Sequence, residues 1–257
     1  MRGIPQRVIA VDWSGAKRQF RKKIWAAVVG PTGLTTLEDG RSREQVRDWL
    51  IEEREKDPNF VVGLDFAFSF PSWFVQSKGC SNAPEFWEYV SREGEAWLTE
   101  LRRPFFTKGG WNSEAQKAYR ATEEALRKEG QRPETVFKLV GATQVGPGSI
   151  RGMPILHDLR EAGFKIWPFD EPSMPFVVEI YPRLFYPGVT KSSLEDRMNH
   201  LEKYSELEDL HRTKATCSDD AFDAAVSALK MFERRNEFAR LGQTSGESIH
   251  LEGMIWC

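Results

Sequence analysis

Cysteine is scarce in the sequence, and long apolar runs are missing. The 257 residues include three widely separated cysteines, Cys80, Cys217 and Cys257, without the spacing of a metal-binding motif. An odd number of scattered cysteines does not form a disulfide framework, so we expect free thiols in a reducing compartment. No run of about 18 apolar residues is present, and the N-terminus MRGIPQRVIAVDWSG lacks the apolar core of a signal peptide. These absences predict a cytoplasmic protein without a membrane partner.

The chain also lacks a strong net charge of either sign. Its 36 Lys and Arg residues nearly balance 38 Asp and Glu residues, which leaves a formal charge of −2. Such a chain has no global attraction to nucleic acid, so nucleic acid as a partner would require a local basic patch. The stretch KRQFRKK at residues 17–23 is one candidate, with Phe20 among its basic residues. It is typical of a nucleic-acid contact with a stacking ring, or more simply of a solvated hairpin tip.

The order of the apolar segments predicts an α/β fold. We expect strands at residues 7–15, 23–30, 33–40, 59–71, 164–169 and 176–182. A helix begins after Ser42 and separates the third strand from the fourth, whose continuous apolar run is typical of a central parallel strand. Three antiparallel strands followed by parallel ones, flanked by helices, are the arrangement of a ribonuclease-H-like mixed sheet.

The segment 72–162 is too long for a simple crossover between strands. Helical spacing near residues 84–103, 113–130 and 153–162 predicts a helical insertion that packs over the sheet. No Ser/Gly-rich linker flanks the insertion, so we expect residues 1–257 to form a single domain.

An acidic seam runs along a predicted helix that is otherwise apolar. At 100° per residue, Asp219, Asp220, Asp223 and Lys230 of CSDDAFDAAVSALKM (217–231) fall within an arc of roughly 100°. Aspartate caps helix starts, which is the simpler explanation for Asp219. Capping does not explain all three aspartates, so we interpret Asp220 and Asp223 as functional residues.

Three further acids interrupt apolar strands. They are Asp12 in AVDWSG, Asp65 in GLDFAF and Glu179 in VVEIYP. A desolvated carboxylate costs several kcal/mol unless it is paired, protonated or bound to metal. Together with Asp220 and Asp223, these acids predict a shared divalent ion, Mg²⁺ or Mn²⁺, because both ions prefer carboxylate oxygens. Two such ions about 4 Å apart can catalyse phosphodiester hydrolysis.

Other residues are candidates for binding a substrate phosphate. Ser14 follows the first strand, and Arg183 follows Glu179, where it would neutralise a phosphate or pair with a neighbouring acid. The glycine-rich stretch GATQVGPGSIRG (141–152) would cradle phosphate together with Arg151, or is an ordinary turn. Lys230, on the acidic seam, would orient water or an acid, or is an exposed helix lysine.

Five segments together resemble the family called domain of unknown function 429, whose members are predicted ribonuclease-H-like nucleases. The segments are IAVDWSG, GLDFAFSFP, GATQVGPGSIRGMP, VVEIYP and SDDAFDAAVSAL. The last one also resembles a helix of Holliday-junction resolvases, in which two aspartates three positions apart precede an Ala-rich stretch, as Asp220 and Asp223 do. The resemblance implies a ribonuclease-H-like fold, two Mg²⁺ ions on acidic residues, and action on DNA or RNA.

Our leading hypothesis is therefore a metal-dependent nuclease. In it, Asp12, Asp65 and Asp223 hold the metal, while Glu179 and Asp220 complete or tune the cluster. One alternative is a phosphotransferase or ATPase on the same fold, with the glycine-rich stretch on the nucleotide phosphates. Another is a catalytically silent binding protein, because the fold alone does not determine function.

Overall fold

A six-stranded mixed sheet forms the centre of the computed structural model, which describes residues 3–105, 118–141, 144–242, 244, 246 and 248–257. The strand order is β3-β2-β1-β4-β6-β5. The strands are β1 (Arg7–Asp12), β2 (Trp25–Gly30), β3 (Gly33–Glu38), β4 (Phe60–Leu64), β5 (Lys165–Ile166) and β6 (Phe176–Glu179). The β1–β2 and β2–β3 pairs are antiparallel, whereas β1–β4, β4–β6 and β5–β6 are parallel. The α/β class and the mixed sheet predicted from the sequence are confirmed.

Strand β4 is shorter than the sequence predicts, because it ends at Leu64 instead of continuing to residue 71. After Asp65, whose N–H still donates to the Val11 carbonyl of β1, the N–H groups of Ala67 and Phe68 are satisfied by side chains. The N–H of Ala67 donates to Ser149 Oγ at 3.1 Å, and the N–H of Phe68 donates to a Glu179 carboxylate oxygen at 2.9 Å. The apolar run therefore leaves the sheet and enters the aromatic core next to it.

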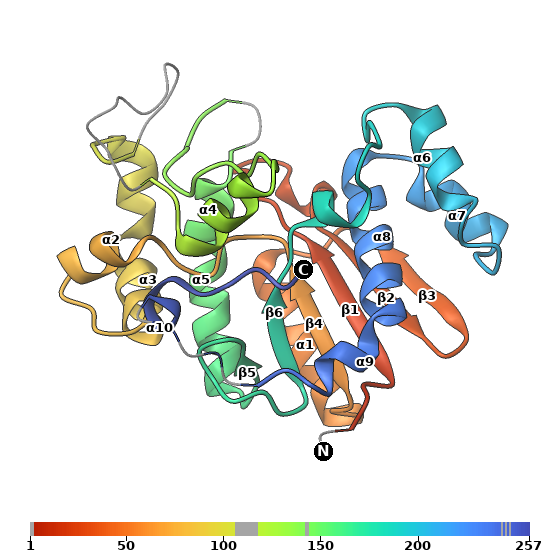
Figure 1. The fold of residues 1–257 in the computed structure, drawn as a ribbon, viewed down its shortest axis with the longest axis horizontal. Helices are drawn as coiled ribbons and strands as arrows, with labels where there is room; N and C mark the ends of the chain where they lie inside the picture. The colour runs from red at the N-terminus through yellow and green to blue at the C-terminus, as the bar shows by residue number, and fades with distance from the viewer. Residues whose placement is uncertain (1–2, 106–117, 142–143, 243, 245, 247) are drawn as a thin grey trace.

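Alternate residues of the central strands pack against different helices. Val8 and Ala10 belong to the apolar cluster that contains the inner face of α8 (Asp219–Glu233), whereas Ile9 belongs to the cluster with α1 (Arg43–Lys56). Helix α8 crosses one face of the sheet over β1 and β2 (Figure 1). Gly63 of β4 permits the close approach, since a Cβ there would lie 2.6 Å from the Met231 sulfur. Asp12 has the same parity as Val8 and Ala10, so its side chain is on the α8 face.

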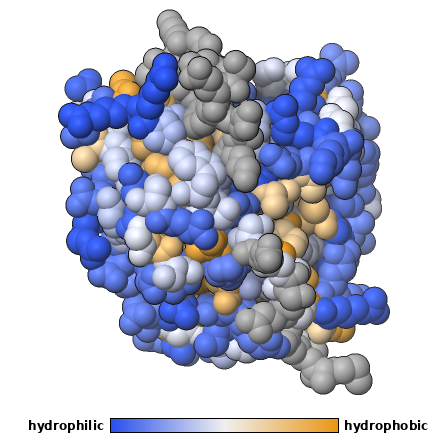
Figure 2. All heavy atoms as spheres, turned by 60° about the vertical axis from the view of Figure 1, so that its left-hand side comes forward, coloured by the Kyte–Doolittle hydropathy of each residue, from blue (hydrophilic) through white to orange (hydrophobic). Residues whose placement is uncertain are grey.

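The predicted insertion is helical, and part of it forms a layer on the sheet. It contains α2 (Ser72–Ser77), α3 (Ala83–Glu100), α4 (Ala121–Lys128) and α5 (Gly146–Glu161). Helix α5 starts earlier than predicted and packs against α1 and α3, while α2, α3 and α4 lie to one side of the sheet (Figure 1). Residues 113–117 of the predicted middle helix lie outside the described residues. On this side the described surface is mainly hydrophilic, with small hydrophobic areas (Figure 2).

The C-terminal part of the chain adds short helices and closes one edge of the site. These helices are α6 (Leu194–Leu201), α7 (Asp209–Ala215), α9 (Arg235–Phe238) and α10 (Ile249–Glu252). After α10, Ile255 forms a parallel bridge with Glu179, and the N–H of Trp256 donates to the Glu179 carbonyl at 2.8 Å. Among the described residues, no helix has the length and apolar character needed to cross a bilayer. The three cysteines carry free thiols.

Candidate active site

A pocket of about 810 Å³ opens where β1, β4 and β6 end, and two aspartates lie at its base. Asp12 is the last residue of β1, and Asp65 directly follows β4. The two strands are paired in register, and the Asp65 N–H donates to the Val11 carbonyl at 3.1 Å. Because paired strands are about 4.8 Å apart, the two carboxyl groups are neighbours.

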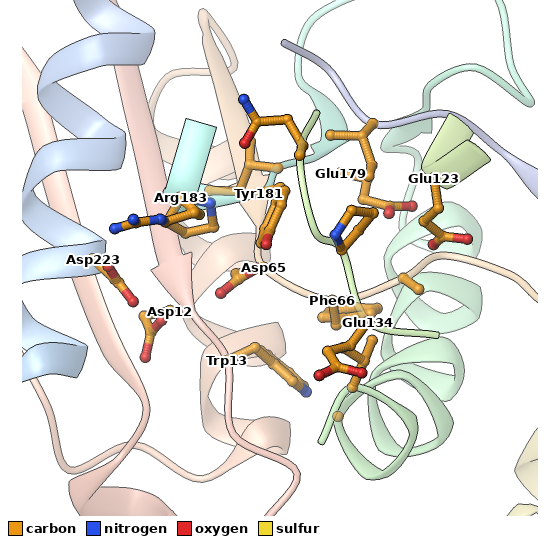
Figure 3. Close-up of a pocket in the computed structure, with 18 of the residues that line it drawn as sticks. Asp12, Trp13, Asp65, Phe66, Glu123, Glu134, Glu179, Tyr181, Arg183 and Asp223 are labelled. Carbon is orange, nitrogen blue, oxygen red and sulfur yellow. The ribbon is translucent and has the colours of Figure 1, made fainter. Parts of the chain in front are cut away.

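The N-terminal part of α8 brings two more aspartates to the same pocket. Ser218 caps this helix by accepting a hydrogen bond from the Ala221 N–H at 3.0 Å, which leaves Asp220 and Asp223 available for the pocket. Asp223 is 2 % exposed, and its carboxyl group lies on the same side of Tyr181 as those of Asp12 and Asp65 (Figure 3). The structure therefore brings together four aspartates that the sequence singled out. Asp219 is neither a cap nor a pocket residue, because it pairs with Arg197 at 3.1 Å.

The proximity and burial of these acids change their ionisation. Burial is the largest cause that raises the pKa of Asp12 well above its ordinary value, and the charge of Asp223 is the next. The same two causes raise the pKa of Asp65 to about 8. Burial also raises the pKa of Asp223 and of Asp220. The metal-free cluster is thus a site of unfavourable negative charge that a cation would stabilise.

Sequence reasoning missed two residues that hold Asp223 in place. The Tyr186 hydroxyl donates to Asp223 Oδ1 at 2.6 Å, and the Lys191 ammonium donates to Oδ2. Tyr186 belongs to the segment that follows the 3₁₀ helix Pro182–Phe185, and Lys191 lies in the loop before α6. Neither position is part of a periodic pattern or a motif, so no signal in the sequence identifies them.

Glu179 lies in the wall of the pocket but is held by an arginine instead of joining the aspartates. Both of its carboxylate oxygens accept hydrogen bonds from Arg120, which is fully buried and also pairs with Glu123 at 2.6 Å. In Figure 3, Glu179 and Glu123 lie on the opposite side of Tyr181 from Asp12 and Asp223. The expectation that Glu179 completes the cluster overlooked this partner, because Arg120 comes from the insertion. Glu179 still contributes to the raised pKa of Asp65 through its charge.

Of the four predicted phosphate-binding residues, only Arg183 lines the pocket. Its guanidinium donates to the Val189 carbonyl and lies 5.5 Å from the Tyr186 ring centroid. Ser14 is buried beside β1, and its hydroxyl accepts from the Ala16 N–H at 3.2 Å. Arg151 pairs with Glu95 at 2.6 Å and donates to the Gly15 carbonyl. Lys230 is half-buried and pairs with Glu233 at 2.9 Å on α8.

The described part of the glycine-rich stretch is mostly a helix start, and Gln144, Val145 and Gly148 of this stretch line the pocket. Residues 146–152 form the first turns of α5, and residues 142–143 lie outside the described residues. A Cβ on Gly15 would be 2.2 Å from the Gly148 nitrogen, so the glycines serve the close packing of α5 against the end of β1. Residues 146–152 are thus a helix start rather than a loop, and the phosphate cradle stays a prediction.

The donor set of the pocket fits a divalent ion of the magnesium type. Carboxylate oxygens of Asp12, Asp65 and Asp223 are hard ligands, and their mutual repulsion favours a cation between them. Within the described ranges, no three His, Cys, Asp or Glu side chains are arranged around a common point as a finished metal cage. Lys191 partly neutralises the cluster in this arrangement, so metal binding would require the aspartates to reorient.

Comparison of the chain with protein-family models, curated proteins and solved structures gives no match. The resemblance to the domain of unknown function 429 family stays a prediction from the quoted motifs.

Proposed function

We propose that the protein is a magnesium-dependent phosphodiesterase that acts on nucleic acid. The observation that carries this proposal is the convergence of Asp12, Asp65, Asp220 and Asp223, from two strand ends and one helix, in one pocket. Buried aspartates that lie close together with few basic partners repel each other when ionised, and this repulsion lowers the free energy of unfolding. Such an arrangement is expected where a metal ion compensates for the cost.

The arrangement of the sheet supports a ribonuclease-H-like fold within this proposal. Three antiparallel strands come first in the chain, and β4 pairs parallel with β1. The acids are at the carboxyl ends of the parallel strands, where ligands bind in open α/β sheets. The helix that supplies Asp220 and Asp223 covers the same face on which Asp12 lies.

Asp12, Asp65 and Asp223 would hold the ion, and Mn²⁺ would fit the same donors. A bound Mg²⁺ supplies a Lewis acid that makes water a better nucleophile and stabilises charge at phosphorus. Tyr186 fixes Asp223 through its 2.6 Å hydrogen bond, and Arg183 places a positive charge in the pocket wall. In the hydrolysis, the water oxygen bonds to phosphorus and the ester P–O bond breaks. One water proton goes to the leaving alcohol, and the other stays on the product phosphate or passes to solvent.

The exposed basic stretch 17–23 supports nucleic acid as the substrate. Lys17, Arg18, Lys22 and Lys23 are exposed, and the charge of Lys23 acts on Asp220 in the pocket. The end of the stretch at Lys23 is therefore near the acidic cluster, and the stretch would contact phosphates next to the bond to be cut. Phe20 does not supply a stacking ring, because it packs on the core and the Arg43 guanidinium is 4.4 Å from its ring centroid.

The proposal is tested by cleavage assays on the Asp12→Asn variant. We expect the wild type to cut labelled single- or double-stranded DNA or RNA in Mg²⁺ and to stop in EDTA. Asp12→Asn should lose at least about 10²-fold of this activity, because a neutral amide is a weak ligand for Mg²⁺. Circular dichroism should show an intact fold, and Asp39→Asn, at an exposed position outside the pocket, is the matched control. Undiminished cleavage by Asp12→Asn, or cleavage that EDTA does not affect, would remove the proposal.

A further inference from the structure

Lys191 places a positive charge among the aspartates of the pocket, which a site that binds only metal ions would not need. We infer that the site binds one divalent ion and that the Lys191 ammonium takes the place of a second one. This inference rests on the proposed phosphodiesterase function. It names a residue that would contact the substrate phosphate, and it replaces the expected two-ion site with a site of one ion and one lysine.

Lys191 is held in position by its backbone. Arg197 of α6, which is buried, donates from Nη1 to the Lys191 carbonyl and from Nη2 to the Thr216 carbonyl at 2.8 Å. The neighbouring Thr190 N–H donates to Asp196 at 2.9 Å. These contacts fix the loop at residues 190–191 to the segment just before α8. The backbone of Lys191 is therefore fixed, and its side chain extends from this position to Asp223.

The ammonium occupies an oxygen that a second ion would need. Asp223 Oδ2 accepts from Lys191, and Oδ1 accepts from Tyr186. In a two-ion site the metals lie about 4 Å apart, so at least one carboxylate must serve both ions. A second ion on Oδ2 would lie within a few ångströms of the ammonium, and the two positive charges would repel each other. One ion bound by Asp12, Asp65 and Oδ1 of Asp223, an oxygen that keeps a second lone pair beside the Tyr186 hydrogen bond, avoids this conflict.

The charges of the three proposed ligands agree with a single ion. Asp12, Asp65 and Asp223 carry three negative charges when ionised, and one Mg²⁺ with one ammonium neutralises them. The Lys191 ammonium supplies its positive charge directly against the Asp223 carboxylate, to which it donates a hydrogen bond. An ammonium group has three N–H donors, of which Asp223 uses one. The other two remain for a phosphate oxygen of the substrate, whose developing negative charge they would stabilise.

Lys191 is not a typical surface lysine, although 41 % of its side chain is exposed. Its partner Asp223 is buried, and its charge also acts on Asp12, Asp65 and Asp220. An ion pair between two exposed side chains is worth little and is easily replaced by water. Lys56, whose side chain is exposed and pairs with the partly buried Glu53 at 2.8 Å outside the pocket, is the matched control.

Counting bound Mn²⁺ on the full chain tests the inference independently of turnover. Isothermal titration and electron paramagnetic resonance should give one Mn²⁺ per wild-type chain, with the spectrum of an isolated ion. Lys191→Met should accept a second, spin-coupled Mn²⁺ and cleave at least ten-fold more slowly when one ion is bound. Lys191→Arg should keep one ion, and Lys56→Met should behave as the wild type.

The outcomes separate this inference from the proposed function. Two Mn²⁺ ions in the wild type would overturn the lysine inference and leave the phosphodiesterase proposal standing. Wild-type cleavage by a folded Lys191→Met variant would also overturn it, because the ammonium would then be an ordinary salt-bridge partner. Absence of Mn²⁺ binding by the wild type would instead remove the phosphodiesterase proposal itself.

Discussion

Replacing Asp65 by asparagine is expected to stabilise the metal-free protein at alkaline pH. In the folded chain, burial and the charge of Asp223 raise the pKa of Asp65 from an ordinary 3.8 to about 8. Between these two pH values the folded state binds a proton that the unfolded chain has lost. The free energy of unfolding therefore falls as the pH rises from about 4 to about 8, and the contribution of Asp65 is constant below and above this range.

The size of the effect follows from this shift. A pKa difference of about 4 units corresponds to about 5 kcal/mol at 1.36 kcal/mol per unit. Side-chain relaxation and entry of water reduce the cost of a buried charge, so we expect about 2–3 kcal/mol of added stability for Asp65→Asn at pH 9. At pH 5.5 the wild-type carboxyl is largely protonated in the folded state, and the gain should be less than about half as large.

Urea unfolding in EDTA, followed by tryptophan fluorescence at both pH values, measures the two gains. Asp39→Asn serves as the control, because Asp39 is exposed and lies outside the pocket. Added Mg²⁺ should stabilise the wild type more than Asp65→Asn, since the variant offers one fewer charged ligand. A gain that is equal at the two pH values, or a loss of stability at pH 9, would refute the account of crowded carboxylates.

Two further predictions concern other parts of the pocket. Arg120→Met should lower the free energy of unfolding by about 3–5 kcal/mol, because it leaves the buried Glu179 and Glu123 carboxylates without their cation. Urea unfolding at pH 7 measures this free energy, and a loss below about 1 kcal/mol would contradict the prediction. Replacing Arg18 and Lys22 together by glutamine should weaken binding of a labelled oligonucleotide and reduce the slope of log K against log salt by about 1.5–2. Fluorescence anisotropy at several salt concentrations measures that slope, and an unchanged slope would exclude the basic stretch from the phosphate contacts.

Most of the sheet could be predicted from the sequence, because its strands are apolar runs bounded by turns. The parallel pairing of β4 with β1 followed from a continuous apolar run, which requires burial on both faces. The end of β4 was harder to predict. Residues 66–70 are as apolar as the strand itself, and only tertiary contacts with Ser149 and Glu179 take their backbone out of the sheet.

The aspartates of the site were predictable because each is unusual where it stands, in a strand or a helix that is otherwise apolar. Tyr186 and Lys191, the partners of Asp223, were not predictable, because they occupy a loop and the end of a short helix where such residues are common. Glu179 looked identical to Asp65 in the sequence, and the difference between them is made by Arg120, which is far away in the chain. Local sequence reports which residues are costly to bury, and it does not report which distant residue compensates for the cost.

The bridge between Ile255 and Glu179 has a consequence for the timing of biosynthesis. Residues 252–255 pack beside the end of β6, and the Glu252 carboxylate accepts a hydrogen bond from the Ala121 N–H at 2.7 Å. This segment therefore holds part of the pocket wall in place. A ribosome produces these residues after all four aspartates. The wall of the pocket is therefore completed only after all of its acidic residues have been synthesised.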